Sequence, residues 1–335
     1  MKTVQFNGTI TTLSPVTVSL PDVSGMARTT QGLPMIPAST LRGLLRHSAH
    51  EAMAYLSHQA GRNLTVDQHY MLAAGVDTAR VIKDGAATKV GHTAALRAKN
   101  PMLSVFGRWG LAGRLGVGSA VAQDANCLII MGNGSRHHPF NRNPGLTDFV
   151  PVEELDYLQQ ILMADSQASE STSDLKDEEK ALKKEVRGAS AERKAEINAR
   201  LAEIAAIIRE VKDERVGSRE AIQRPLDGFE AIDAGHQLSH RMTLQNPTDQ
   251  ELHLVLWAIA IASHQPMVGG HRNLGCGYIA GDWTITSQSL GEGKPVELGK
   301  VGFNDEGFFC TVPGFDADAV SQAIKSGEIA LTDFA

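Results

Sequence analysis

The strongest hydrophobic pattern in the chain lies near its C-terminus. Thr248 and Glu251 form a T-x-x-E capping box, and the residues that follow are apolar on almost every side. This combination predicts a buried helix that extends to about His264. Alternating apolar and polar residues at 237–244 and 278–286 predict one strand before this helix and one after it.

The N-terminal region shows both the strand and the helix period. Alternation at Val4–Ile10 and Val16–Leu20 predicts the two strands of a hairpin, followed by a loop over residues 21–37. Ser39 suits the N-cap of a helix. One face of that helix is apolar and consists of Leu41, Leu45, Ala49, Ala52 and Leu56.

The middle of the chain is more polar. Residues 64–99 have no clean period, whereas 100–107 predicts a short helical turn and 113–121 another strand. Lys, Glu and Ala dominate residues 166–215, which predicts a polar helical hairpin broken at 188–190. Its apolar seam packs within the hairpin or, alternatively, contacts another protein. The seam consists of Ile197, Leu201, Ile204, Ile208 and Val211.

Composition excludes several classes of protein. The 335 residues, 42% of them hydrophobic, suffice for one large core or two smaller ones. There is no apolar run of about 18 residues and no signal-peptide pattern, so we expect a soluble cytoplasmic protein without membrane contact. The three cysteines form no CxxC pair, which argues against a disulfide framework and a structural zinc site. We expect no cofactor.

Charge is distributed unevenly. The net charge is −6, and nine acidic residues face three basic ones from Asp282 to the end of the chain. Residues 80–142, by contrast, contain nine Lys and Arg against two Asp. A locally basic surface on an acidic protein suits a chain that grips a phosphate backbone along one groove, although ordinary charge fluctuation would give the same count.

The segment 269–277, GGHRNLGCG, is the first candidate for binding chemistry. Its four glycines allow the backbone to approach a ligand closely, and Arg272 adds a charged fork. We interpret it as a polyanion-binding loop that includes Gly269, Gly270 and His271. The alternative is a tight turn between helix and strand, because the spacing matches neither common phosphate-binding glycine motif.

A second candidate is the helix after Ser39. Arg42, Arg46 and His50 follow one another at spacings of four and form a basic stripe along it. The helix N-terminus and the arginines together could contact RNA phosphates about one turn apart. Solvated surface arginines are the alternative.

Two further segments carry isolated candidates. Arg136 lies in a probable loop over residues 132–145, where it contacts phosphate or is plain surface. Arg224 and Phe229 flank a turn marked by Pro225 and Gly228. Phe229 could wedge between bases, as some nucleic-acid-binding proteins do, or pack back on its own domain.

Three motifs in order resemble the RAMP superfamily. IPASTLRGLLRH resembles the family's IPGSSLKGxLR motif, and NPMLSVFG with GRLGVGSA resembles its LFG region. GGHRNLGCGYI resembles its C-terminal glycine loop. The resemblance covers residues 4–50, 100–122 and 217–285. It is closest to the Cas-seven type of backbone subunit in class 1 CRISPR effector complexes, and chain length with the helical insertion favours the type IV version over type III.

The resemblance implies an α+β fold, a modified RRM-like or ferredoxin-like palm with inserted helical and thumb segments. The palm would comprise residues 1–59, 100–149 and 237–335. A finger-like insertion would span residues 60–99, a helical hairpin 150–216 and a thumb 217–236.

The implied function is binding of the CRISPR RNA, the guide. Copies of the chain would stack helically along it in a ribonucleoprotein with other effector subunits and present it to target DNA or RNA, in defence against viruses or plasmids. By motif position, Ser39, Arg42, Arg46, Gly270, His271 and Arg272 would bind the guide backbone. Only 5% of residues are aromatic, so backbone contacts should dominate over base stacking.

Two other functions remain open. Type III backbone subunits carry a loop aspartate that cleaves target RNA with a metal ion, and Asp22 is the nearest counterpart here. It precedes the family position, which holds Gly25, Met26 and Ala27, and a lone carboxylate makes a weak metal site. We therefore expect no catalytic residue and no metal. The third function is a protein scaffold without RNA, built on the helical hairpin.

Overall fold

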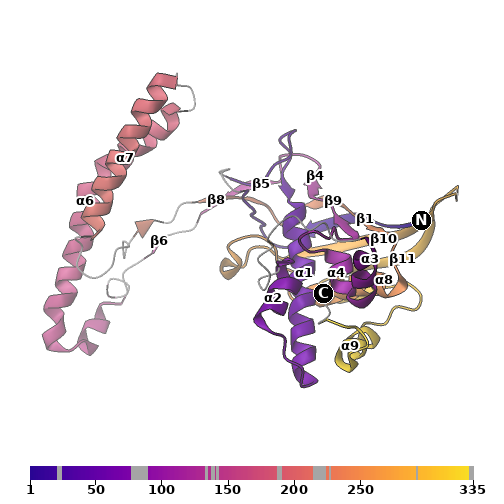
Figure 1. The fold of residues 1–335 in the computed structure, drawn as a ribbon. Coiled ribbons are helices and arrows are strands. Elements are labelled where there is room, and N and C mark those ends of the chain that lie inside the picture. Colours follow the sequence, from indigo (N-terminus) through magenta and orange to yellow (C-terminus); the bar gives the residue numbers. More distant parts are fainter. Residues whose placement is uncertain are drawn as a thin grey trace. The chain divides into compact units, whose positions relative to one another are not determined.

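The computed structural model describes residues 1–20, 25–76, 90–132, 135–136, 140, 143–186, 191–213, 224–225, 228–291 and 293–331. They form two compact units (Figure 1). The first comprises Met1–Met131 with Phe229–Ala335, and the second Gly132–Gly228. No helix in these described ranges is long and apolar enough to cross a membrane.

The first unit is built on one antiparallel sheet in the order β12-β11-β10-β1-β9-β4-β2, with β3 also paired to β9. The long central strands are β1 (Lys2–Thr12), β9 (Gln237–Gln245) and β10 (Ile279–Ser289). The others are β2 (Met35–Ile36), β3 (Leu115–Val117), β4 (Ala120–Ala122), β11 (Val296–Asn304) and β12 (Gly307–Cys310).

The N-terminal hairpin expected from the sequence is wrong. β1 lies between β10 and β9 and pairs with both, as Phe6 opposite Ile285 and Met242 shows. Val16 makes only an isolated bridge, to Ile232. Local alternation identified β1 as a strand but could not identify partners more than 200 residues away.

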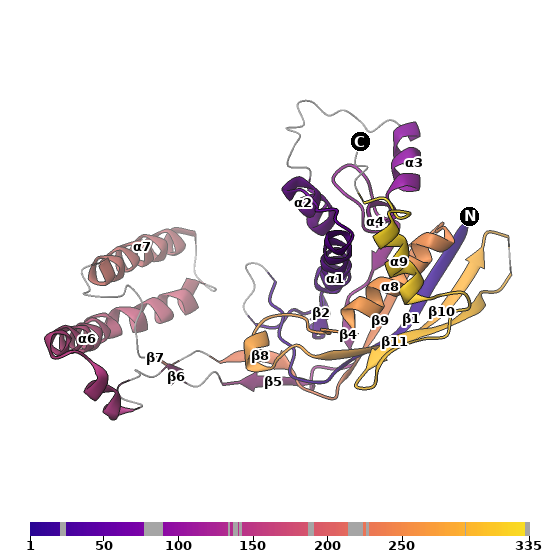
Figure 2. The ribbon, with the colours of Figure 1, turned by 90° about the horizontal axis from the view of Figure 1, so that it is seen from below.

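Strands and helices follow the β-α-β-β-α-β order of a ferredoxin-like fold. Helix α1 (Ala38–Gln59) follows β1, β3 and β4 precede β9, and α8 (Asp249–Ala262) joins β9 to β10. The spatial order β10-β1-β9-β3/β4 is that of this fold. Both helices cover the same face of the sheet (Figure 2). The α+β, ferredoxin-like prediction is confirmed.

The opposite face of the sheet is polar. Val4, Phe6 and Ile10 of β1 are buried toward the helices, and the residues that alternate with them include Gln5 and Asn7. Along β1, β9 and β10, which are described throughout, the residues of this open face include no aromatic side chain. The base-stacking aromatic face of an ordinary RRM is therefore not built on these strands.

Helix α8 confirms the strongest pattern in the sequence. The Thr248 hydroxyl accepts the Glu251 N–H (3.2 Å), and the Glu251 carboxylate accepts the Thr248 N–H (2.8 Å). Trp257 and its neighbours are fully buried because α8 packs against α1, the sheet and α9 (Ala317–Ser326). The predicted strands on each side are β9 and β10.

The start of α1 differs from expectation. The helix begins at Ala38, with Pro37 at the N-cap and no capping side chain from within the helix. The Ser119 hydroxyl instead accepts the Ala38 N–H at 3.1 Å. Ser39 is therefore a first-turn residue, and the prediction that it caps the helix is wrong.

The region 60–107 contains more helix than the sequence predicted. α2 (Val66–Ala74), with a capping box from Thr65 and Gln68, and α3 (Val90–Lys99) lie where no period was evident. The predicted short helix is α4 (Pro101–Phe106), capped by Asn100 and buried along its whole length. Two short strands, β3 and β4, replace the single strand expected at 113–121. β5 (Leu128–Met131) pairs with β8 (Phe229–Ile232).

The second unit is a helical hairpin, as predicted. It consists of α6 (Leu155–Glu185) and α7 (Ala191–Asp213), preceded by the short helices η1 (Pro144–Phe149) and η2 (Val152–Glu154). Ile197, Ile204 and Ile208 of the seam are buried within the hairpin. Arg200 of α7 pairs with Glu178 of α6 at 2.7 Å. The unit also contains the short pair β6 (Ser135–Arg136) and β7 (Arg224–Pro225).

Candidate functional site

The glycine loop, residues 269–277, is held against the chain that follows β1. Gly269 has a φ of +79°, and a Cβ added there would collide with the Thr17 carbonyl. The Gly270 N–H donates to the same carbonyl at 3.0 Å, and the Gly277 N–H donates to the Pro15 carbonyl at 2.9 Å. Glycine is therefore required for close backbone approach, and the loop is anchored at both ends.

The middle of the loop faces solvent. His271 has a φ of +55°, uncommon for a residue with a side chain, and the short helix η4 (Arg272–Leu274) follows it. His271, Arg272 and Asn273 are exposed. Their N–H groups have no hydrogen-bond acceptor among the residues that the structure describes, and Arg272 Nε donates to the Gly269 carbonyl at 3.3 Å. The loop thus presents free donors and a guanidinium to an anion.

Phe229, the first residue of β8, stacks on His271. The ring centroids are 3.9 Å apart and the planes differ by 7°. Glu230 fixes β8 at this position, because its carboxylate accepts the Met26 N–H (3.0 Å) and a bond from Arg28 (2.8 Å). These two contacts lower the pKa of Glu230, the Met26 N–H most strongly. Two candidates distant in sequence therefore form one aromatic pair at the glycine loop.

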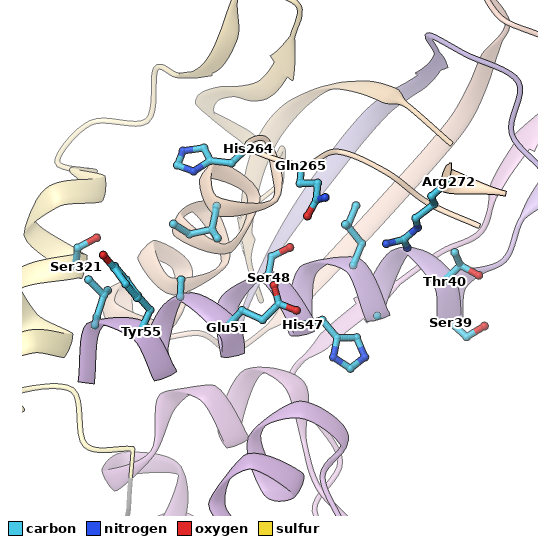
Figure 3. Close-up of a pocket in the computed structure, with 15 residues that line it drawn as sticks. Ser39, Thr40, His47, Ser48, Glu51, Tyr55, His264, Gln265, Arg272 and Ser321 are labelled. Atoms are coloured by element: carbon cyan, nitrogen blue, oxygen red, sulfur yellow. The ribbon is translucent and has the colours of Figure 1, made fainter. Parts of the chain in front are cut away.

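An open groove of about 700 Å³ runs along α1 beside this loop (Figure 3). Ser39 and Thr40 lie at one end with Arg272, and Tyr55 lies at the other end with Ser321 of α9. The remaining lining residues come from α1, from the end of α8 and from the residues just after it. They are Gly43, Leu44, His47, Ser48, Glu51, Ala52, Leu56, Ile261, His264 and Gln265.

The sequence had not singled out most of this groove. Residues 39, 43, 47, 51 and 55 are spaced by four, so they occupy one face of α1. This spacing could have predicted a shared face. However, the face combines polar, acidic, basic and aromatic residues, so the arginine stripe gave the clearer indication of RNA binding.

The arginine stripe lies on the other side of α1, where it packs on α2 and α4. Arg46 Nε donates to the Leu72 carbonyl at 2.6 Å, and its Nη2 donates to the Met71 carbonyl at 2.9 Å. Its side chain is 8% exposed. Burial, with a smaller contribution from Arg42, lowers the pKa of Arg46 to about 10, so it stays charged at neutral pH. Arg46 therefore joins α2 to α1. This corrects the expectation that it contacts the guide backbone.

The other two members of the stripe are also turned toward the protein. Arg42 is half-buried, and its Nη2 donates to the Phe106 carbonyl. His50 Nε2 lies 2.9 Å from His69 Nδ1. Burial, followed by the charges of His69, His47 and Arg46, lowers the pKa of His50 to about 4. His50 is therefore neutral at pH 7 and adds no charge to the stripe.

The remaining candidates are only partly described. Arg136 and Arg224 are directly opposite one another in the β6–β7 pair, but their side chains lie outside the described part of the chain. Asp22 also lies outside it. Among the residues that are described, no cluster of three His, Cys, Asp or Glu side chains could hold a metal ion.

Comparison with known families supplies the decisive observation. The family model of the RAMP superfamily matches residues 9–280, more than half of the chain. The chain belongs to the RAMP superfamily. RAMP proteins are CRISPR-associated and bind RNA, which agrees with the positions of the glycine loop and α1 on a ferredoxin-like core. The match includes every candidate residue of this RAMP protein and ends before β11 and α9. A search of curated proteins gave no match.

Proposed function

We propose that this RAMP protein is a CRISPR RNA-binding backbone subunit of a class 1 effector complex of type IV, in which copies stack along the guide. The observation that carries the proposal is the surface formed by Phe229, His271 and Arg272 beside the α1 groove. A stacking pair, a guanidinium and free N–H groups lie together at the edge of the ferredoxin-like core.

This surface suits RNA whose sequence varies. Phosphates accept bonds from the loop N–H groups and from Arg272, and these contacts carry no sequence information. A base can stack on the exposed side of an aromatic pair, since every base has a π-face. The protein would thus hold different spacers equally well and leave their pairing edges to the target.

The role is binding rather than cleavage. Asp22 is the one residue that favours a type III-like endoribonuclease, and a lone carboxylate makes a weak metal site because hard cations usually take several oxygen ligands. Guide-loaded protein with complementary RNA and Mg²⁺ should leave the target intact. Cleavage by wild type that is lost in Asp22→Ala would establish the enzyme instead.

Salt dependence of guide binding tests the proposal directly. Fluorescence anisotropy with a labelled repeat–spacer RNA should give an affinity that falls steeply as salt rises. Arg272→Ala should weaken binding and reduce the slope by about one phosphate contact. Lys300→Ala, which removes an exposed cation from β11, is the matched control and should leave the slope unchanged.

Failure would have a clear form. Absence of RNA binding by the wild-type chain would favour the protein scaffold. Equal effects of Arg272→Ala and Lys300→Ala would mean that binding depends on overall charge rather than on the glycine loop. Complementary DNA and RNA strands, offered in turn to the loaded protein, would identify the target.

A further inference from the structure

The second unit exposes a surface that is both acidic and apolar, a composition poorly suited to nucleic acid. Phe149 and Val152 are 84% and 80% exposed, and Tyr157 follows within the first turn of α6. Four exposed carboxylates lie among them, and none has an ion-pair partner among the described residues. No Lys or Arg occurs from residue 143 to 175. We call this surface the acidic patch: Asp148, Phe149, Val152, Glu153, Glu154, Asp156 and Tyr157.

Large exposed apolar side chains grouped in this way mark a protein contact. Their partner must offer apolar area together with positive charge, because four unpaired carboxylates repel RNA and any acidic surface. The first unit of the same chain presents a surface of that composition.

That surface is built around Trp109, which is 79% exposed on a tight turn. The turn is rigid, since Arg108 and Leu111 exchange backbone hydrogen bonds at 3.0 and 2.9 Å. The backbone N–H of Trp109 donates to the Gly75 carbonyl at 3.0 Å, which places residue 109 beside the end of α2, where Tyr70 and Val76 are also exposed. We call Tyr70, Val76, Arg108 and Trp109 the tryptophan patch.

The sequence around the tryptophan patch carries a positive net charge. The segment 90–123, which includes Trp109, contains Arg97, Lys99, Arg108 and Arg114 and no acidic residue, and residues 66–76, which include Tyr70, contain one acid, the exposed Asp67. Arg114 is already paired with Glu251 at 2.6 Å. A rigid, exposed tryptophan beside cations is typical of residues that dominate the energy of an interface.

We propose that the acidic patch of one copy docks on the tryptophan patch of the next copy. The two patches differ, so the contact is head-to-tail, and each added copy leaves one patch free at each end. Such a contact propagates into an open filament unless its rotation closes a ring. This inference rests on the proposed stacking of copies along the guide and assigns the surfaces that join them.

Sedimentation velocity of nuclease-treated, RNA-free protein tests the contact. Wild type should form larger species as its concentration rises. Trp109→Ala and Glu153→Lys/Glu154→Lys should each weaken assembly at least tenfold. An equimolar mixture of these two variants should form a species of two copies and no larger one, because each supplies the patch that the other lacks. Leu290→Ala, at an apolar residue 84% exposed elsewhere, should assemble like wild type.

Three results would overturn the inference. These are a wild-type chain that stays monomeric at its highest soluble concentration, variants that assemble like wild type, or a mixture that stays monomeric. Should Trp109→Ala misfold by circular dichroism, Tyr70→Glu tests the same patch. RNA affinity is measured in parallel: if it is absent while assembly follows the expected pattern, the guide-binding function fails and the interface stands. If Trp109→Ala lowers only RNA affinity, the tryptophan patch binds nucleic acid instead.

Discussion

Replacement of Arg46 separates structural support from RNA contact. The guanidinium donates to the Leu72 and Met71 carbonyls at 2.6 and 2.9 Å and is 8% exposed. A hydrogen bond that involves a charged group contributes about 1.5–3 kcal/mol, and Arg46→Ala would also leave two carbonyls without this donor. We therefore expect the free energy of unfolding to fall by about 3–5 kcal/mol. That loss is large against a typical total of about 5–15 kcal/mol.

Urea unfolding followed by circular dichroism measures this loss. Arg46→Lys retains the charge but cannot reach both carbonyls with a planar fork, so it should recover only part of the stability. RNA affinity, measured well below the unfolding midpoint, should change little in Arg46→Lys. Arg272→Ala should behave in the opposite way, with unfolding within about 0.5 kcal/mol of wild type and weaker RNA binding.

The reasoning would be refuted by a stable Arg46→Ala protein. If its unfolding free energy lies within about 1 kcal/mol of wild type, the two carbonyl contacts do not support the fold as argued. If such a protein also binds RNA as weakly as Arg272→Ala, Arg46 contacts the guide, and the side of α1 assigned to the groove is wrong.

Three further predictions concern pH, stacking and the loop backbone. Burial lowers the pKa values of His240 and His50 from 6.5 to about 4, so stability should be complete above pH 6.5 and should fall as pH drops from 6.5 to 4. His240 should contribute up to about 3 kcal/mol of this loss, and an unfolding midpoint that is equal at pH 7 and 4 would contradict the prediction. Phe229→Ala should weaken guide binding by about 1–3 kcal/mol, whereas Phe229→Trp should retain it. If Phe229→Ala lowers the affinity in anisotropy titrations by less than about twofold, Phe229 does not stack on the RNA. Gly269→Ala should lower the free energy of unfolding in urea by at least about 2 kcal/mol and weaken RNA binding, because the added Cβ would collide with the Thr17 carbonyl. Gly275 has the same φ of +79° but open space around it, so Gly275→Ala should lower the free energy of unfolding by only about 1 kcal/mol. Equal losses would show that the contact with Thr17 is unimportant.

Local sequence determined the elements whose signals are local. The capping box of Thr248 and Glu251 and an apolar run determine where α8 begins and that it is buried. Asn100 and Pro101 determine α4 in the same way, and the glycines of 269–277 predict a loop between helix and strand. The hairpin of α6 and α7 also follows from its seam, because the seam is buried between two helices adjacent in the chain.

Tertiary structure decided what depends on distant partners. The period of α1 showed that Arg42, Arg46 and His50 share a face, but only the packing of α2 and α4 determined that this face is covered. β1 was evident as a strand, yet its partners lie more than 200 residues away, and nothing local favours them over the adjacent 16–20 segment. Phe229 and His271 were separate candidates until β8 brought their rings to 3.9 Å. Periodicity fixes which residues share a face, whereas the burial of that face depends on contacts that no short window of sequence contains.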